Sequence, residues 1–234
     1  MYSGQHVLDV GAGTGNVAIR AAEKGAQVVA SDLTPENFEA GRHEARAHGV
    51  KLEWVEADAE ALPFSDGEFD VVTSSVGAIF APRHQTVADQ LVRVCRTGGT
   101  IGMTSIVPAG LAGDWFEIIE RYSPPASSDA LSPLLWGDES HVRALFGDQV
   151  ESLDITRKKL LIERFTDPVD LGLFMKANHP LFVGLYEQLA DKPARVAALD
   201  LELAEAATRW NHGGPDGPAI YEIEYLLIVT RKRN

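Results

Sequence analysis

Residues 7–15 read Val-Leu-Asp-Val-Gly-Ala-Gly-Thr-Gly, a short apolar run that leads into three alternating glycines. Val7, Leu8 and Val10 predict a buried β-strand. The glycines let the backbone take positive φ angles and approach a ligand closely. The segment Thr14–Lys24 predicts a helix whose first N–H groups are free to bind a negatively charged group. A strand, a glycine turn and a helix in this order are typical of the opening of a nucleotide-type α/β domain.

The spacing of the glycines separates two candidate ligands. The dinucleotide fingerprint is G-x-G-x-x-G. Here the third glycine comes one residue early, and Asn16 stands where that fingerprint has glycine. Asp9 lies two positions before the first glycine, Gly11. The resulting D-x-G-x-G-x-G pattern resembles motif I of the class I S-adenosylmethionine (SAM)-dependent methyltransferases.

An acidic residue follows the second predicted strand, Gln27–Ser31. Asp32 comes 21 residues after Gly11, close to the spacing at which an acidic residue meets a ribose. A carboxylate can accept hydrogen bonds from both ribose hydroxyls. We expect Thr34 to be the N-cap of the next helix, which would leave Asp32 for the ligand.

Two later segments extend the resemblance. Asp58-Ala59-Glu60-Ala61-Leu62-Pro63-Phe64 resembles the methyltransferase segment D-A-x-x-L-P-F, which lines the adenine. The resemblance implies that Asp58 accepts a hydrogen bond from the adenine amino group. Arg96-Thr97-Gly98-Gly99 is similar to the R-P-G-G that breaks the family's helix before strand five, here Thr100–Ile106, with Thr97 in place of proline.

These ordered motifs span residues 7–106 and resemble the small-molecule branch of the family, which includes quinone and sterol methyltransferases. The resemblance implies that the following residues bind SAM: Asp9, Gly11, Ala12, Gly13, Thr14, Gly15, Asp32, Leu33, Asp58, Ala59, Ser75 and Val76.

The fold implied by the resemblance is α/β: a Rossmann-like, doubly wound sheet of about seven strands, mostly parallel, with an antiparallel last strand and a helical cap. We expect a single methyltransferase domain with a cofactor-binding core over 1–107, cap insertions over about 108–147 and 167–214, and closing strands over about 150–164 and 220–232. Pro168–Trp210 predicts a helical stretch. Related enzymes carry helices before the first strand that help close the cofactor pocket. Because the predicted strand begins about six residues into this chain, we expect the cap segments to exclude water instead.

Composition excludes several classes of partner. The formal net charge is −13, whereas a nucleic-acid partner needs a basic surface. The apolar runs are too short to span a bilayer. Cys95 is the single cysteine, so an internal disulfide is impossible, which fits a reducing cytoplasm. We therefore expect a cytoplasmic protein with a small-molecule partner, no nucleic acid and no membrane insertion; a homodimer stays open.

Methyl transfer from a sulfonium depends mostly on alignment and the exclusion of water. A protonated nucleophile would still need a base. His84 and His141 are the candidate catalytic residues, although His84 could instead only begin a helix and His141 could be a solvated helix residue. No convincing pair of metal ligands is present. The candidate substrate-pocket residues, which could instead belong to the core, are Phe80, Trp115, Trp136, Phe174 and His179.

The sequence thus predicts a SAM-dependent methyltransferase that acts on a small, apolar or aromatic molecule by in-line displacement. The product from the cofactor would be S-adenosylhomocysteine, and no metal is expected. The acceptor atom, O, N, C or S, stays open. One alternative is a nicotinamide-dependent oxidoreductase, against which stand Asn16 and the lack of a Tyr-x-x-x-Lys pair. The other is a SAM-binding protein without catalysis.

Overall fold

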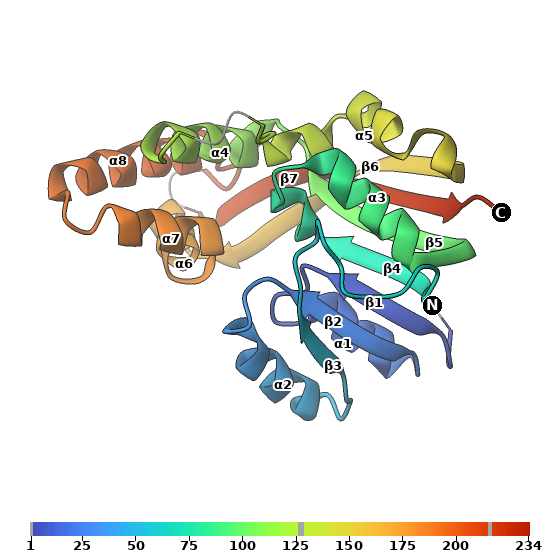
Figure 1. Ribbon diagram of the computed structural model, residues 1–234. Coiled ribbons are helices and arrows are strands. Elements are labelled where there is room, and N and C mark those ends of the chain that lie inside the picture. Colours follow the sequence, from blue (N-terminus) through green and yellow to red (C-terminus); the bar gives the residue numbers. More distant parts are fainter. Residues whose placement is uncertain (1, 126–128, 215–216) are drawn as a thin grey trace. The chain divides into compact units, whose positions relative to one another are not determined.

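The computed structural model describes residues 2–125, 129–214 and 217–234 (Figure 1). These residues form a seven-stranded sheet in the order β3-β2-β1-β4-β5-β7-β6, in which β7 is antiparallel to the other strands. The strands are β1 (His6–Val10), β2 (Gln27–Asp32), β3 (Glu53–Glu56), β4 (Phe69–Ser75), β5 (Cys95–Ile106), β6 (Val150–Phe165) and β7 (Ala219–Lys232). The predicted fold class is confirmed.

Helices connect these strands. The α-helices are α1 (Asn16–Glu23), α2 (Asn37–Ala47), α3 (His84–Val94), α4 (Gly110–Tyr122), α5 (Glu139–Phe146), α6 (Pro168–Asn178), α7 (Pro180–Gln188) and α8 (Pro193–Arg209). Short 3₁₀ turns are η1 (Ala78–Phe80), η2 (Pro133–Gly137) and η3 (Gly147–Gln149). Within the described ranges, every helix is too short or too polar to cross a membrane.

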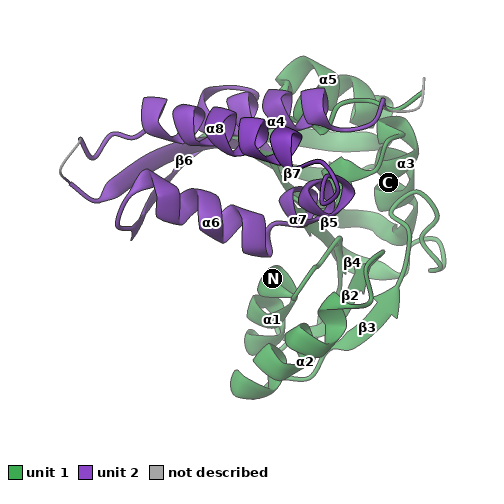
Figure 2. Ribbon diagram, turned by 90° about the vertical axis from the view of Figure 1, so that its left-hand side faces the viewer, with its two compact units in different colours: residues 1–105, 129–157, 226–234 green, residues 106–128, 158–225 purple. Residues whose placement is uncertain are grey.

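The chain divides into two compact units, drawn in different colours in Figure 2. Unit 1 comprises residues 1–105, 129–157 and 226–234, and unit 2 comprises residues 106–128 and 158–225. The predicted cap segment 108–147 therefore contributes to both units, and its residues 126–128 lie outside the described part of the chain.

The core of unit 1 is built around the apolar strand β1, which pairs with β2 on one side and β4 on the other. In β1, Val7 is in register with Val28 of β2 and with Val71 of β4. All three valines are buried, and the small side chains of Ala18 and Ala21 on α1 pack against this cluster. Alanines at the contact let the helix axis approach the sheet closely, which places the start of α1 at the carboxyl end of β1.

Two local predictions for unit 1 are wrong. Helix α2 begins at Asn37, after Glu36 as N-cap, because the Thr34 backbone N–H donates to the Oδ1 atom of Asp32 (2.9 Å) and residues 34–36 form a turn. Strand β5 begins at Cys95, directly after α3, so the predicted break at 96–99 lies inside the strand. Phe69 and Val71 of β4 pair with Cys95 and Thr100 of β5, so residues 96–99 are extra residues that form an irregularity in β5.

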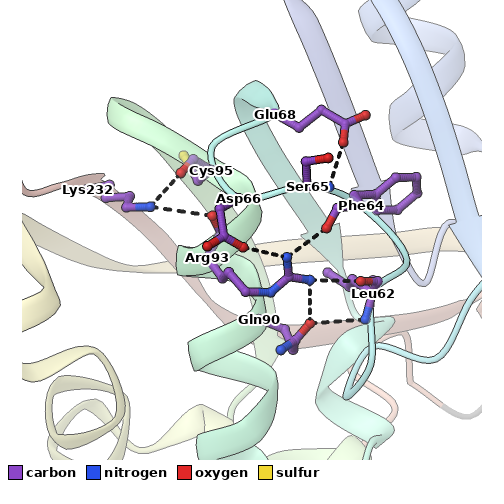
Figure 3. Close-up of polar contacts among 9 residues, drawn as sticks. All are labelled: Leu62, Phe64, Ser65, Asp66, Glu68, Gln90, Arg93, Cys95 and Lys232. Carbon is purple, nitrogen blue, oxygen red and sulfur yellow. Dashed lines mark hydrogen bonds and ion pairs between the residues drawn. The ribbon is translucent and has the colours of Figure 1, made fainter.

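Arg93 on α3 fixes the segment that follows β3 (Figure 3). Its guanidinium donates to the carbonyl oxygens of Leu62 (2.8 Å) and Phe64 (2.7 Å) and pairs with Asp66 (2.9 Å). The neighbouring Gln90 side chain accepts from the Leu62 N–H (3.1 Å). The D-A-x-x-L-P-F segment is thus held at its Leu-Pro-Phe end by hydrogen bonds from α3.

Unit 2 contains three helices where the sequence predicts one stretch over 168–210. The prediction missed the breaks because Pro180 and Pro193 open α7 and α8 at their first positions, and the residue before a proline avoids the helical conformation. Leu199, Leu203 and Ala207 of α8 are buried in the core of the unit. The Trp115 indole N–H of α4 donates to the Leu203 carbonyl oxygen (3.1 Å).

The close approach of two backbones in unit 1 generates a prediction. A Cβ atom added at Gly77 would lie 2.2 Å from the Gly11 carbonyl oxygen, and backbone atoms cannot move aside as a side chain can. We expect Gly77→Ala to lower the free energy of unfolding by about 2 kcal/mol or more. Gly102→Ala in β5, where nothing lies within 4 Å of the added atom, is the matched control. Urea denaturation measures both, and equal stability of the two variants would contradict the contact.

Candidate functional site

The glycine loop lies at the carboxyl end of β1. Gly11, Gly13 and Gly15 have φ angles of +66°, +56° and +85°, which side chains rarely adopt. A Cβ atom added at Gly15 would lie 2.7 Å from the Trp54 ring, whereas an added atom at Gly13 would meet nothing within 4 Å. The loop is therefore packed against Trp54 at Gly15, whereas it has room for a ligand at Gly13.

Asp9 lies in the core of unit 1 and is 2% exposed. Its Oδ2 atom accepts from the Ala18 N–H of α1 (3.1 Å), and its Oδ1 atom accepts from the Thr73 hydroxyl of β4 (2.8 Å). Burial raises the pKa of the Asp9 carboxyl to about 7, although both hydrogen bonds act in the opposite direction. The bonds that the structure shows for Asp9 hold the helix that follows the loop.

Asp32 ties the loop to β2. Its Oδ2 atom accepts from the Gly13 N–H (2.7 Å), and its Oδ1 atom accepts from the Thr34 N–H (2.9 Å). Thr34 thus does not cap the next helix as expected, and its N–H instead donates to Asp32. Each carboxylate oxygen has two acceptor positions, so both can still accept from a ligand. Leu33, the next residue, is 64% exposed and presents apolar surface beside this carboxylate.

Strained backbone follows β4. Val76 has a φ of +54°, and in the described ranges it is the only residue besides glycine with positive φ. This conformation is unfavourable for a β-branched side chain and persists only where its surroundings impose it. The Val76 N–H donates to the Thr104 carbonyl oxygen of β5 (3.1 Å), and the Ser75 and Thr104 hydroxyls are 2.9 Å apart. Gly77 then meets Gly11, so this turn supports the glycine loop.

The two candidate catalytic histidines contact each other within unit 1. His84 Nδ1 and His141 Nε2 are 3.0 Å apart, and the His84 ring packs against Trp136 with 5.3 Å between centroids. His84 is fully buried, and that burial lowers its pKa to about 4, with a further contribution from His141. His141 is half-buried, and burial lowers its pKa as well. Both imidazoles are therefore neutral at pH 7.

The five candidate pocket residues separate into two groups. Phe80 and Trp136 belong to unit 1, where Trp136 is fully buried and its carbonyl accepts from the Ser105 hydroxyl (2.6 Å). Trp115, Phe174 and His179 belong to unit 2. Trp115 and His179 line a cavity of about 140 Å³ there, whereas Phe174 packs against Phe165 and lies under Arg164.

The sequence argument missed the residues that support the loop from other strands. Thr73 binds Asp9, Gly77 meets Gly11, and Trp54 packs at Gly15. The dipeptide Val76-Gly77 after a strand is a signal that could have indicated an unusual turn. Nothing local to Thr73 or Trp54 marks a partner, because those contacts arise only when β4 and β3 take their places in the sheet.

Burial of Asp9 makes the stability of the fold depend on pH. The usual pKa of this carboxyl is 3.8, and its pKa in the fold is about 7. Between these values the folded chain keeps a proton that the unfolded chain loses, so the Asp9 contribution to stability declines as pH rises from about 4 to 7. In Asp9→Asn, the free energy of unfolding relative to the wild type should rise over this window and level off above it.

The measurement is chemical denaturation of both proteins at intervals from pH 5 to 8. The difference between variant and wild type isolates Asp9 from other titrating groups, and Asp191→Asn, at a carboxylate that is 80% exposed, is the matched control. A difference that stays constant across the range would show that Asp9 is ionised in the fold.

Comparisons with known proteins identify the family. A family model described as a methyltransferase domain matches residues 7–99. The chain is 42% identical to the uncharacterized protein Rv1403c of Mycobacterium tuberculosis, over 98% of this chain and 82% of that protein. It is 30% identical to the ubiquinone/menaquinone biosynthesis C-methyltransferase UbiE of Zymomonas mobilis, over 77% of this chain and 72% of that enzyme.

A solved structure supports the same fold. The crystal structure of a putative methyltransferase from Bacillus halodurans superposes with a TM-score of 0.65 at 21% identity, covering 100% of this chain and 95% of that one. The structure has the glycine loop, the acidic residue after β2 and the antiparallel β7. The UbiE relative matches the chain over 72% of its own length. The chain belongs to the class I SAM-dependent methyltransferase family, with resemblance to its quinone methyltransferases.

Proposed function

We propose that this protein transfers a methyl group from SAM to a small, apolar or aromatic molecule. The observation that supports the cofactor is the glycine loop, held at Gly13 by Asp32 and with open space where a Gly13 side chain would stand. Because Asp32 holds this loop, its backbone N–H groups and the start of α1 are in position to bind a ligand.

The residues around the loop fit SAM. Asp32 has acceptor positions left for the two ribose hydroxyls. The exposed Leu33 side chain would pack on the adenine face, and Asp58, whose Oδ1 atom accepts from the Glu60 N–H (2.9 Å), keeps its second oxygen for the adenine amino group. Bound SAM supplies an electrophilic methyl carbon on a sulfonium.

The apolar character of the substrate is proposed from the cavity of unit 2, in which twelve of the thirteen lining residues are apolar. Methyl transfer to a protonated acceptor releases one proton. We assign proton acceptance to the half-buried His141, which is neutral at pH 7, whereas the fully buried His84, whose pKa is lowered to about 4, orients it through their hydrogen bond.

The same proposal includes a cytoplasmic location, a small-molecule partner and catalysis without a metal. The sole cysteine, Cys95, is buried, and burial raises its pKa to about 11, so this thiol is unreactive. Among the described residues, no cluster of three His, Cys, Asp or Glu side chains could hold a metal ion.

A turnover assay tests the proposed function. The chain is incubated with SAM and a panel of phenols, quinones, amines and thiols, and S-adenosylhomocysteine release is measured together with the methylated product by mass spectrometry. We expect methylation of at least one apolar aromatic acceptor, at a rate that EDTA leaves unchanged. Tight binding of S-adenosylhomocysteine without any product would instead support a non-catalytic SAM-binding protein.

The role of Asp32 generates a second prediction. Asp32→Ala removes the ribose acceptor and the tie to Gly13, so affinity for S-adenosylhomocysteine should fall at least about tenfold, a loss of about 1.5–3 kcal/mol. Isothermal titration calorimetry measures the affinity, with the exposed Asp148→Ala as control. The wild type should show no saturable binding of NADH.

A ligand-side comparison separates the two effects of Asp32. The wild type should bind the 2′,3′-dideoxy analogue of S-adenosylhomocysteine more weakly than the parent compound, and Asp32→Ala should bind both alike. If the variant still prefers the parent compound, Asp32 acts only on the loop and another group holds the ribose.

A further inference from the structure

Glu60 is a buried carboxylate in the segment between β3 and β4, and the proposed function leaves it without a role. Its side chain is 4% exposed. Its Oε1 atom accepts from the backbone N–H of Arg83 (2.6 Å), and its Oε2 atom pairs with the guanidinium of the same residue. Burying a carboxylate costs free energy unless such partners compensate it. Both partners that the structure shows belong to Arg83, so Glu60 fixes the position of Arg83.

Arg83 is the N-cap of α3, and this helix start has no side-chain cap of its own. The Arg83 side chain makes no capping hydrogen bond. A glutamate at the third helical position can accept from the N-cap N–H, but α3 has Thr86 there. Glu60 makes that hydrogen bond from another segment of unit 1, and its negative charge is also favourable at the start of a helix. The segment after β3 therefore holds the first turn of α3.

The first residue of α3 is His84, the partner of His141. His84 is fully buried, and its Nδ1 atom lies 3.0 Å from His141 Nε2. The carbonyl oxygen of Pro82, directly before Arg83, accepts from the Leu131 N–H (3.0 Å). Because a buried ring cannot shift freely, the position of His84 depends on the position of the helix start. The hydrogen bond that orients His141 depends on it in turn.

Glu60 also belongs to the segment that the proposed function places at the adenine. Asp58 lies two residues before it, and the Asp58 Oδ1 atom accepts from the Glu60 backbone N–H (2.9 Å). Glu60 thus contacts Asp58 through its backbone and the start of α3 through its side chain. One residue of unit 1 joins the proposed adenine contact to the partner of the proposed proton acceptor.

We propose that Glu60 is a positioning residue for His141 and that it couples cofactor binding at Asp58 to the orientation of that imidazole. A proton acceptor works only in a defined orientation, which the surrounding residues must fix. The Glu60 carboxylate fixes the start of α3 and with it His84, which orients His141. A ligand bound at Asp58 changes the backbone position of Glu60, and the Glu60 side chain carries this change to α3. This role rests on the proposed function, in which His141 accepts the proton.

The test follows the ring resonances of His141 by ¹H–¹⁵N NMR of the full chain, with and without saturating S-adenosylhomocysteine. We expect the ligand to shift these resonances in the wild type. Glu60→Gln keeps an oxygen that accepts from the Arg83 N–H but cannot pair with the guanidinium. In this variant the ligand-induced shift should fall to about half or less of its wild-type size. The pKa of His141 should rise, because burial lowers it and a looser pair is less buried.

Two further variants make the result decisive. Arg83→Met removes the guanidinium, at a side chain that is 56% exposed, and should change His141 in the same direction. Asp66→Asn is the matched control, because it removes an exposed ion pair with Arg93 from the same segment and should leave His141 unchanged. Urea denaturation of each variant separates a loss of stability from a loss of orientation.

Two results overturn the proposal. One is a wild type in which bound S-adenosylhomocysteine leaves the His141 resonances unshifted. The other is a wild-type pKa and ligand response of His141 in Glu60→Gln or, if that variant does not fold, in Arg83→Met.

Turnover gives an independent readout. With an acceptor from the assay above, Glu60→Gln should lower kcat about tenfold and leave the KM of the acceptor unchanged, because orientation of a reacting group acts on the chemical step. Weakened coupling without any methylated product supports the role of Glu60 and contradicts the proposed function. Product formed by Glu60→Gln at the wild-type rate does the reverse.

Discussion

The buried carboxylate of Asp9 joins three elements of unit 1. It lies on β1, accepts from the backbone of α1 at Ala18 and accepts from the Thr73 hydroxyl of β4. The glycine loop is the connection between β1 and α1, so its ends are fixed by this one side chain. The backbone contact between Gly11 and Gly77 fixes the loop from the β4 side. The strained Val76 is tolerated because this contact and the bond to Thr104 over-determine it.

Burial gives unit 1 two titrating groups with opposite effects on stability. Asp9 keeps a proton in the fold that the unfolded chain loses, so it favours folding at the acid side of the range between pH 4 and 7. His84, with its pKa lowered from 6.5 to about 4, stays neutral where the unfolded chain is charged, so its contribution is lost as pH falls from 6.5 towards 4. The two effects oppose each other over this range of pH.

The parts of the candidate site that could be predicted are those whose residues lie close together in the sequence. The loop glycines and Asp32 follow directly from spacing along the chain. The pairing of His84 with His141 was not predictable, because 57 residues separate them and the contact depends on how α5 packs against α3. The aromatic residues did not predict the substrate pocket. Trp115 and Trp136 lie in the same predicted cap segment, but Trp115 lines a cavity and Trp136 is fully buried in a core.

The sequence by itself determined the glycine loop and the acidic residue after β2, and its resemblance to the methyltransferases implied the fold class. The loop depends on backbone conformations that only glycine adopts readily, which is a property of neighbouring residues. Only the tertiary structure decided that β5 begins at Cys95 and that Asp32 holds Gly13. It also decided that His179 lines an apolar cavity of unit 2. Each of these results depends on atoms from distant segments, because register, burial and hydrogen-bond partners are set when strands and helices pack together.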